Sequence, residues 1–307
     1  MVGGSGPAAV VAAVRDVADA GVRRAWLPQV FGGEALTTIA LAGREFPDVE
    51  FGTAVIPTYP RHPLVLAEQA LTTSAALGGG RLHLGIGLSH QVVIEGMLGM
   101  AFAKPATHMR EYLSALRPAL EGQPVAVKGE TLQANTLMGP LRVDGAGPVP
   151  ILVAALGPAL LRVAGELADG TLTWMAAPAV IGDRIAPSIT AAAEAAGRPR
   201  PRVGVGLPVA VTDDVDAALE RAAASYAVYG TLPSYRRLLD EAGIDSPAGV
   251  VIAGDEDEVA NRIRALADVG ATEFLASPIG SRAVRQETLR VLGQLCREGA
   301  VSQETAE

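Results

Sequence analysis

The chain has 307 residues, of which 49% are hydrophobic, so it can bury one large α/β domain or two smaller ones. Its net charge of −8 argues against a nucleic-acid surface, and no apolar run reaches the roughly 18 residues that a membrane helix requires. Its single cysteine, Cys296, excludes an internal disulfide and a cysteine metal cluster, and the N-terminus lacks a signal-peptide pattern, so we expect a cytoplasmic protein.

Strand-like segments alternate with helix-like segments from the first helix, which Ser5 and Pro7 open, to the end of the chain. Apolar strands are predicted at 23–27, 49–51, 81–86, 149–155, 171–174, 202–211 and 272–276. Short apolar strands separated by helices indicate a parallel sheet that helices cover, and eight such units in about 300 residues are typical of a TIM (β/α)8 barrel. An eighth strand would lie at or before Met1 and Val2, so we expect a barrel with insertions whose first strand is truncated or missing.

The segment 52–63 follows the second predicted strand and reads GTAVIPTYPRHP. Its three prolines fix φ, withdraw backbone donors and push the preceding residues out of the α region. A strand that ends so stiffly holds backbone atoms in place, so we interpret the segment as a ligand-facing loop. A proline-stiffened surface loop is the alternative. A helix is predicted over Leu64 to Leu77, with Pro63 at its first turn.

Segment 122–147 interrupts the alternation, and its extended, turn-rich character predicts a hairpin or lid inserted into a single domain that spans 1–307. The polar tail 299–307 is expected to fray.

In a barrel of this kind the chemistry lies where strands end. After the strand at 149–155, Gly157 allows close backbone approach and Pro158 opens a helix whose free N–H groups can hold a phosphate. An ordinary strand-to-helix turn is the alternative. The run from Gly85 to His90 has no third glycine and no acidic residue about 20 positions on, so it is weak evidence for a dinucleotide site.

The four histidines occupy different settings. His83 lies in an apolar strand and is expected to be a packed core residue, whereas His108 is expected to face solvent or cap its helix. For His62, at the end of the proline-rich segment, a structural hydrogen bond and a ligand contact both remain open. His90 follows the strand at 81–86, on the barrel rim, where a residue can exchange a proton near neutral pH; a functional and a structural role are both open for it.

No HExxH, CxxC, GxSxG or Walker pattern and no paired histidine spacing occurs, so we expect no metal site. A rim with so few polar groups fits a protein that binds a large planar ligand with its own reactivity.

The chain resembles the bacterial luciferase-like flavin and deazaflavin oxidoreductases, particularly the branch that uses coenzyme F420. Four segments carry the resemblance: AWLPQVFGG (25–33), FGTAVIPTYPRHP (51–63), RLHLGIGLSH (81–90) and VAALGPALLRVAGELADGTLTW (153–174). The resemblance implies a TIM barrel with a deazaflavin bound across the C-terminal rim, FMN being the alternative cofactor. We expect a homodimer that acts on a small-molecule substrate.

The resemblance also implies roles for individual positions. A non-prolyl cis peptide is expected at Ala54–Val55, and Pro57 matches a position that lines the cofactor. Leu88 and Ser89 match rim residues beside the deazaflavin and its side chain. The positions that match the loop and helix start holding the cofactor phosphate are Leu156, Gly157, Ala159 and Leu160.

At two places the sequence departs from the family pattern, and there the residue roles known in the family do not apply to this chain. Gln29 and Val30 stand where many relatives have an Asp-His pair. His90 stands where the sugar-phosphate dehydrogenase branch has a catalytic Glu, so we do not expect that substrate.

From these residues we expect hydride transfer between C5 of the reduced deazaflavin and an organic substrate, at an activated double bond or a carbonyl (CH–CH or CH–OH chemistry). His90 is assigned proton delivery, and Gln29 is assigned the positioning of substrate or cofactor. The substrate cavity is expected to be apolar and framed by Trp26, Trp174, Met175 and the inserted segment 136–140.

Three alternatives remain open. An FMN-dependent luciferase-like monooxygenase on the same fold would consume oxygen. A non-catalytic flavin- or deazaflavin-binding protein would need the Gly157 loop but not His90 or Gln29. A phosphate-binding barrel isomerase is disfavoured because no Lys, Glu or Asp suited to catalysis stands at a strand end.

Overall fold

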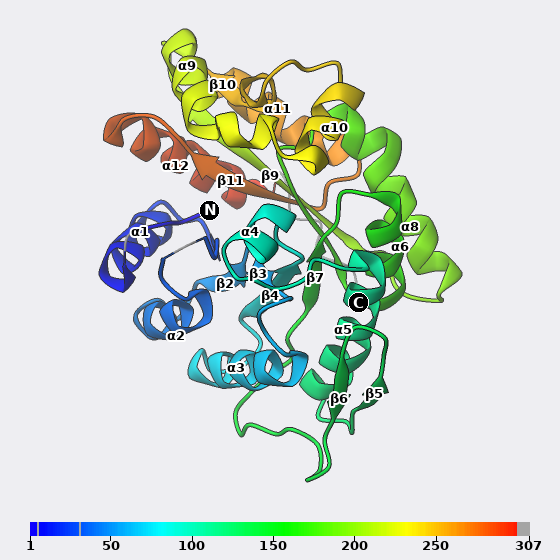
Figure 1. The fold of residues 1–307 in the computed structure, drawn as a ribbon. Coiled ribbons are helices and arrows are strands. Elements are labelled where there is room, and N and C mark those ends of the chain that lie inside the picture. Colours follow the sequence, from blue (N-terminus) through cyan, green and yellow to red (C-terminus); the bar gives the residue numbers. More distant parts are fainter. Residues whose placement is uncertain (5, 31, 300–307) are drawn as a thin grey trace.

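The computed structural model describes residues 1–4, 6–30 and 32–299 of the chain. In this part, parallel strands form a nearly closed barrel that helices surround (Figure 1). The strands are β1 (Arg24–Leu27), β2 (Glu50–Thr53), β3 (Ile56–Pro57), β4 (Leu82–Gly87), β5 (Ala126–Lys128), β6 (Gln133–Asn135), β7 (Ile151–Ala154), β8 (Gly170–Trp174), β9 (Arg202–Val211), β10 (Ile252–Gly254) and β11 (Glu273–Pro278).

Most connections between the barrel strands are helical. The α-helices are α1 (Pro7–Asp19), α2 (Ala35–Glu45), α3 (Pro63–Ala76), α4 (Gln91–Gly96), α5 (Pro105–Leu120), α6 (Pro158–Leu167), α7 (Pro178–Val180), α8 (Ala186–Ala195), α9 (Val215–Tyr226), α10 (Pro233–Glu241), α11 (Glu256–Asp268) and α12 (Arg282–Arg297). The other helical segments are a π-helical turn, η1 (Ile181–Ile185), and two 3-10 turns, η2 (Ala227–Gly230) and η3 (Pro247–Val250). Among the described helices, none combines the length and apolar character needed to cross a membrane.

The barrel strands follow one another in the order β1-β2-β4-β7-β8-β9, each parallel to its neighbour, and β11 pairs with β9. These are the seven strands predicted from the sequence, so the α/β barrel is confirmed. The short strand β10 was not predicted. It pairs with the last three residues of β9, beyond the part of β9 that pairs with β8.

Met1 and Val2 lie between β1 and β11 and hydrogen-bond to both strands. The Val2 N–H donates to the Trp26 carbonyl at 2.9 Å, and the Met1 amine donates to the Ala276 carbonyl. These two residues therefore occupy the place predicted for the eighth strand, and we call the junction of β1, Met1, Val2 and β11 the seam.

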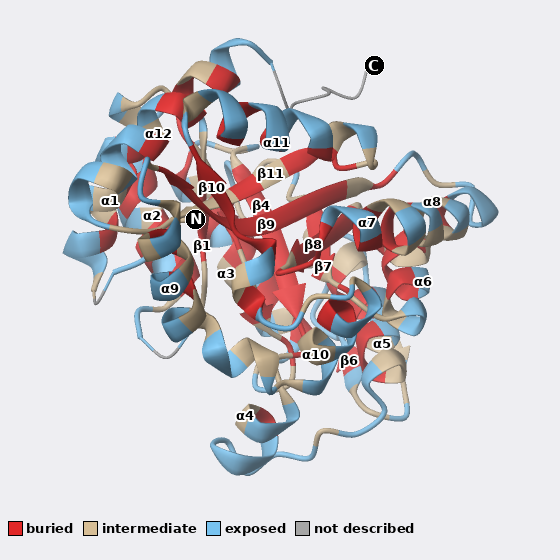
Figure 2. Ribbon diagram, turned by 90° about the horizontal axis from the view of Figure 1, so that it is seen from above, coloured by how far each residue is buried: buried red, intermediate tan, exposed pale blue. Residues whose placement is uncertain are grey.

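The buried residues lie mainly on the barrel strands, which a ring of helices surrounds. All six residues of β4 and nine of the ten in β9 are buried, because both faces of these strands are covered. Figure 2 shows the buried residues gathered on the strands and the exposed residues on the outer faces of the helices. Trp26, Leu152, Leu172 and Leu275 form a cluster of their own. They come from strands on different sides of the barrel, so this cluster fills its interior.

Below this cluster, five side chains form a closed hydrogen-bonded ring at the end of the barrel where the strands begin. Arg24 Nε donates to Glu50 Oε2 at 2.8 Å, and Arg24 Nη1 donates to Glu273 Oε2 at 3.0 Å. Arg202 Nε donates to Glu273 Oε1 at 3.0 Å. His83 completes the ring between Arg202 Nη1 and Glu50 Oε2, with both contacts at 2.9 Å. We call this set of residues the charged ring.

The contacts of His83 define its protonation state. A guanidinium can only donate, so Nδ1 of His83 accepts from Arg202, and the Nε2–H group donates a hydrogen bond to Glu50 Oε2. Burial, with the nearby Arg24 and Arg202 charges, holds the pKa of His83 below its ordinary value. The hydrogen bond from His83 and the Arg24 charge lower the pKa of Glu50 to about 2. His83 is buried, as predicted for a core residue, but it belongs to a polar network rather than to an apolar contact surface.

Segment 122–147 contains an antiparallel hairpin of β5 and β6 that packs against α5. One carboxylate of α5, that of Glu111, accepts the backbone N–H groups of Glu130, Thr131 and Leu132 at the hairpin turn. Of the tail predicted to fray, residues 300–307 lie outside the described residues.

Candidate functional site

The loops that follow the barrel strands hold the predicted site residues. The Ala54–Val55 peptide, between β2 and β3, is cis, as predicted. After it, Ile56 and Pro57 of β3 pair with Ile86 and Gly87 of β4. A Cβ on Gly87 would lie 2.7 Å from Val55 Cγ2 and 3.1 Å from Ala154 Cβ. The top of the barrel is therefore closely packed at Val55, and only glycine fits beside it in β4.

The proline-rich loop after β3 is held from several sides. The Thr58 N–H donates to the Gly87 carbonyl at 2.9 Å, and the Thr58 hydroxyl lies 3.1 Å from His108 Nε2. The His108 ring stacks on Tyr59 with 4.1 Å between the ring centroids and 5° between the planes. The Tyr112 hydroxyl donates to the Arg61 carbonyl at 2.8 Å. These contacts support the interpretation of a rigid loop.

His108 and His62 both have structural roles in this loop. The prediction that His108 faces solvent or caps its helix was wrong. Lys104 is the N-cap of α5, and the helix turns His108 onto Thr58 and Tyr59, where it is 6% exposed and burial lowers its pKa. His62 caps α3: its Nδ1 accepts the Leu64 N–H at 3.3 Å, so Nε2 carries the proton and donates to the Gln133 carbonyl at 2.8 Å. The structural alternative for His62 is the one observed.

The end of β4 directs His90 toward the segment between β9 and β10. Ser89 has a positive φ of 63°, which is uncommon for a residue other than glycine and turns the chain sharply after the strand. His90 then precedes α4 without capping it through its side chain. Its half-buried ring lies 5.8 Å from the ring of Tyr235 in α10. Burial holds the pKa of His90 below its ordinary value, so the neutral imidazole predominates at pH 7.

Four aromatic side chains gather next to His90 in a chain that contains only 4% aromatic residues. Tyr235 contacts Tyr229 at 4.9 Å between centroids, Tyr229 contacts Trp174 at 6.1 Å, and Trp174 contacts Tyr226 at 5.8 Å. We call Trp174 and these three tyrosines the aromatic wall. The tyrosines come from α9, η2 and α10, the segment between β9 and β10 (Figure 1, yellow). Burial raises the pKa values of all three tyrosines, so their hydroxyls stay protonated and can donate.

The residues expected to frame the substrate cavity lie at different depths in the barrel. Trp174 belongs to the aromatic wall, whereas Trp26 lies in the barrel interior and is 4% exposed. Met175, with a positive φ of 57°, is fully buried, and its N–H donates to the Gly206 carbonyl. Segment 136–140 follows β6 beside Val125, just beyond the end of α5, and the structure does not bring it to the rim. The role of Trp26, Trp174 and Met175 toward substrate stays a prediction.

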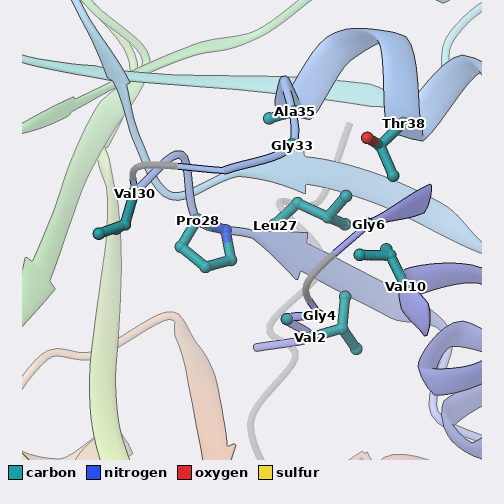
Figure 3. Close-up of a pocket in the computed structure, with 11 residues that line it drawn as sticks. Val2, Gly4, Gly6, Val10, Leu27, Pro28, Val30, Gly33, Ala35 and Thr38 are labelled. Carbon is teal, nitrogen blue, oxygen red and sulfur yellow. The ribbon is translucent and has the colours of Figure 1, made fainter.

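Gln29 follows β1 and contacts the start of α2, where its Oε1 accepts the Ala35 N–H at 3.4 Å. Beside this loop lies a cavity of about 210 Å³ between α1, α2 and β1 (Figure 3). Apart from the Thr38 hydroxyl its lining is aliphatic or backbone, from Val2, Gly3, Gly4, Gly6, Val10, Leu27, Pro28, Val30, Gly33, Ala35 and Thr38. Leu27 alternates with the inward-pointing Trp26, so the cavity lies outside the barrel wall and apart from the loops expected to bind the cofactor.

The start of α6 has the features that an anion requires. Gly157 precedes the helix and Pro158 is its first residue, so the first intrahelical bond is from the Leu161 N–H to the Gly157 carbonyl at 3.0 Å. The N–H groups of Ala159 and Leu160 belong to the first turn and have no acceptor within the helix. A Cβ on Gly157 would meet nothing within 4 Å. Free donors next to open space fit a phosphate group.

Across residues 1–4, 6–30 and 32–299, no three His, Cys, Asp or Glu side chains group in a way that could hold a metal ion. The three tyrosines of the aromatic wall are candidate site residues that sequence reasoning missed. Their close spacing in a chain so poor in aromatic residues was the available signal.

Comparisons with known proteins extend over most of the chain. A family model described as luciferase-like monooxygenase matches residues 1–273. The 5,10-methylenetetrahydromethanopterin reductase of Methanolobus tindarius is 27% identical to this chain over 304 residues, which cover 89% of this chain and 91% of that protein.

Solved structures share the fold. The coenzyme F420-dependent tetrahydromethanopterin reductase from Methanopyrus kandleri has a TM-score of 0.79 at 24% identity and covers 94% of each chain. The oxygenating constituent of 3,6-diketocamphane monooxygenase from Pseudomonas putida, in complex with FMN, has a TM-score of 0.73 at 18% identity, covering 92% of this chain and 90% of that chain.

Proposed function

The chain belongs to the luciferase-like monooxygenase family, and from this premise we propose that it is a coenzyme F420-dependent oxidoreductase. It transfers a hydride between the cofactor and a small organic substrate, at an activated double bond or a carbonyl. The chain is 34% identical over 179 residues to a protein of Mycobacterium tuberculosis that is named a putative coenzyme F420-dependent oxidoreductase, and this likeness in sequence supports F420 over FMN. The homodimer and the cytoplasmic location expected from the sequence stay predictions.

The observation that carries the proposal is the start of α6. Its free N–H groups and the open space at Gly157 suit the cofactor phosphate. The rigid loop at Pro57 and the turn at Leu88 and Ser89 lie on neighbouring strands, where they can hold the ring system in one orientation. Bound F420 would supply or accept the hydride at C5 of its deazaflavin ring.

The remaining groups would act on the substrate. The aromatic wall excludes water and offers hydroxyl donors, while His90 moves the proton that accompanies the hydride. Because the pKa of His90 is lowered, its neutral ring is ready to accept a proton from an alcohol at pH 7. It donates a proton in the reverse direction only from the smaller protonated population.

We expect the substitution Gly157→Val to weaken F420 binding by about 10- to 100-fold, because the new side chain would fill the space that the phosphate needs and displace charge-assisted hydrogen bonds. The backbone φ of −100° accepts valine and nothing lies within 4 Å of the new Cβ, so the barrel should fold normally. Titration of the purified variant with F420, FMN and NADPH in parallel would measure the effect.

Gly6→Val is the matched control for this experiment. Gly6 also precedes a proline at the start of a helix, and a Cβ on it likewise meets nothing within 4 Å. Equal F420 affinity in the folded Gly157→Val and Gly6→Val variants would contradict the assignment of the phosphate to α6.

The closest rival is an FMN-dependent monooxygenase, supported by the fold shared with the FMN-bound camphane enzyme. Oxygen consumption with reduced FMN, in the absence of F420 and faster than that of free reduced FMN, would favour this rival.

A further inference from the structure

Arg184 connects the loop before α6 to α10. It lies on the π-helical turn η1, and segments of this kind occur frequently at functional sites. Its Nη1 donates to the Leu156 carbonyl at 2.6 Å. Its Nε and Nη2 donate to the two carboxylate oxygens of Glu241, the last residue of α10, at 2.7 and 2.9 Å.

The hydrogen bond to Leu156 determines where the next N–H points. Among the described residues the one cis peptide is Ala54–Val55, so the Leu156–Gly157 peptide is trans. In a trans peptide the carbonyl and the N–H point in opposite directions. With the Leu156 carbonyl directed at Arg184, the Gly157 N–H is directed away from it. A charged donor on the carbonyl also polarises that N–H and makes it a stronger donor.

Glu241 holds the guanidinium in this orientation through a two-point contact. The Arg184 and Glu241 side chains are 24% and 35% exposed, and the Arg184 hydrogen bond holds the pKa of Glu241 below its ordinary range. Glu241 therefore stays charged near neutral pH. The same helix carries Tyr235, which lies against His90, so α10 contacts both the proton-transfer side and the phosphate side of the site.

We propose that Arg184 is a positioning residue for the cofactor phosphate: it fixes the Leu156–Gly157 peptide so that the Gly157 N–H donates to the phosphate, and Glu241 keeps it in place. This inference rests on the proposed function, in which the phosphate lies at the start of α6. Arg184 itself lies on the carbonyl side of the peptide and acts through the loop.

The test compares ligands with and without the phosphate. Coenzyme F420, the 5′-phosphate of its deazaflavin fragment (which lacks the anionic tail of F420) and the fragment without the phosphate are titrated against the wild-type protein and the Arg184→Met variant; the 5′-phosphate should lose affinity as F420 does. We expect Arg184→Met to weaken F420 binding at least about 10-fold, which corresponds to roughly one hydrogen bond, and to leave the affinity for the fragment unchanged. Glu241→Gln should weaken F420 binding in the same selective way but by less.

Arg162→Met is the control for net charge. Arg162 is an exposed arginine on α6 itself, so its loss changes the charge near the phosphate without touching the Leu156 carbonyl. Equal losses in Arg162→Met and Arg184→Met would overturn the proposal, as would an equal loss for F420 and for the fragment. Thermal unfolding of each variant separates a binding effect from misfolding.

The same design distinguishes failure of this inference from failure of the proposed cofactor. FMN and riboflavin also differ by a phosphate, and they are titrated in parallel. Binding of FMN in place of F420 would refute the proposed cofactor. A selective loss of FMN over riboflavin in Arg184→Met would then still support the positioning role, and an unselective loss would overturn it.

Discussion

Replacing His90 with alanine is expected to lower turnover by about 10²–10⁴-fold, the usual contribution of a general acid–base group, while F420 affinity changes little. His90 lies on the rim just after Leu88 and Ser89, which follow the end of β4, and its half-buried ring lies against Tyr235. Steady-state kinetics and cofactor titration would measure the two effects separately. His62→Ala is the matched control, because His62 is a rim histidine whose two nitrogens are both occupied by structural hydrogen bonds.

The pH profile tests the direction of proton transfer. Burial lowers the pKa of His90, so its protonated form is lost as the pH rises through a value below about 6.5. If His90 donates the proton, kcat should fall through that pKa; if it accepts the proton, kcat should rise. His90→Gln keeps a hydrogen-bond donor but cannot carry a proton. Wild-type rates in both variants from pH 5 to 8 would show that solvent supplies the proton.

The second large effect concerns stability. Glu273→Gln is expected to lower the free energy of unfolding by about 3 kcal/mol, because it removes the charge that Arg24 and Arg202 share in the charged ring. The Glu273 side chain is 10% exposed, whereas that of Arg24 is 33% exposed, which places the effect at the lower end of the range for buried pairs. Chemical denaturation of both proteins would measure the difference.

An exposed ion pair provides the comparison for Glu273. Glu45 pairs with Arg15 at 3.2 Å, and both side chains are more than half exposed, so Glu45→Gln should change stability by less than about 1 kcal/mol. Similar losses in the two variants would mean that the charged ring contributes no more than a surface pair.

The sequence predicted the barrel because each of its strands is a short apolar run between helical patterns, and burial on both faces of a strand produces that pattern. It did not predict β10, whose three residues are too few to stand out from a loop. The prediction for the position of the His108 side chain was also wrong. His108 lies on the same buried face of α5 as Tyr112, Ala115 and Ala119, so the helical spacing of these residues was the signal that its side chain is buried.

Some features of the candidate site could be predicted from the sequence and others could not. Gly157 and Pro158 carry a local signal, so the start of α6 was predictable. The charged ring and the aromatic wall depend on residues that meet only when the barrel closes. Arg24 and Glu273 are 249 residues apart, and no local pattern links them. The wall forms because α9 and α10 place Tyr226 and Tyr235 beside Trp174 and His90.

The seam has a consequence for the motions of the barrel. There, two backbone hydrogen bonds from Met1 and Val2 and one ion pair between Arg24 and Glu273 join β1 to β11. Elsewhere backbone ladders join the neighbouring strands directly, with two paired positions between β2 and β4 and five between β8 and β9. Local opening follows the places with the fewest bonds. In native-state hydrogen–deuterium exchange, the amides of β1 and β11 should therefore exchange at lower opening free energies than those of β4 and β8. Local opening of the barrel would then occur mainly between β1 and β11.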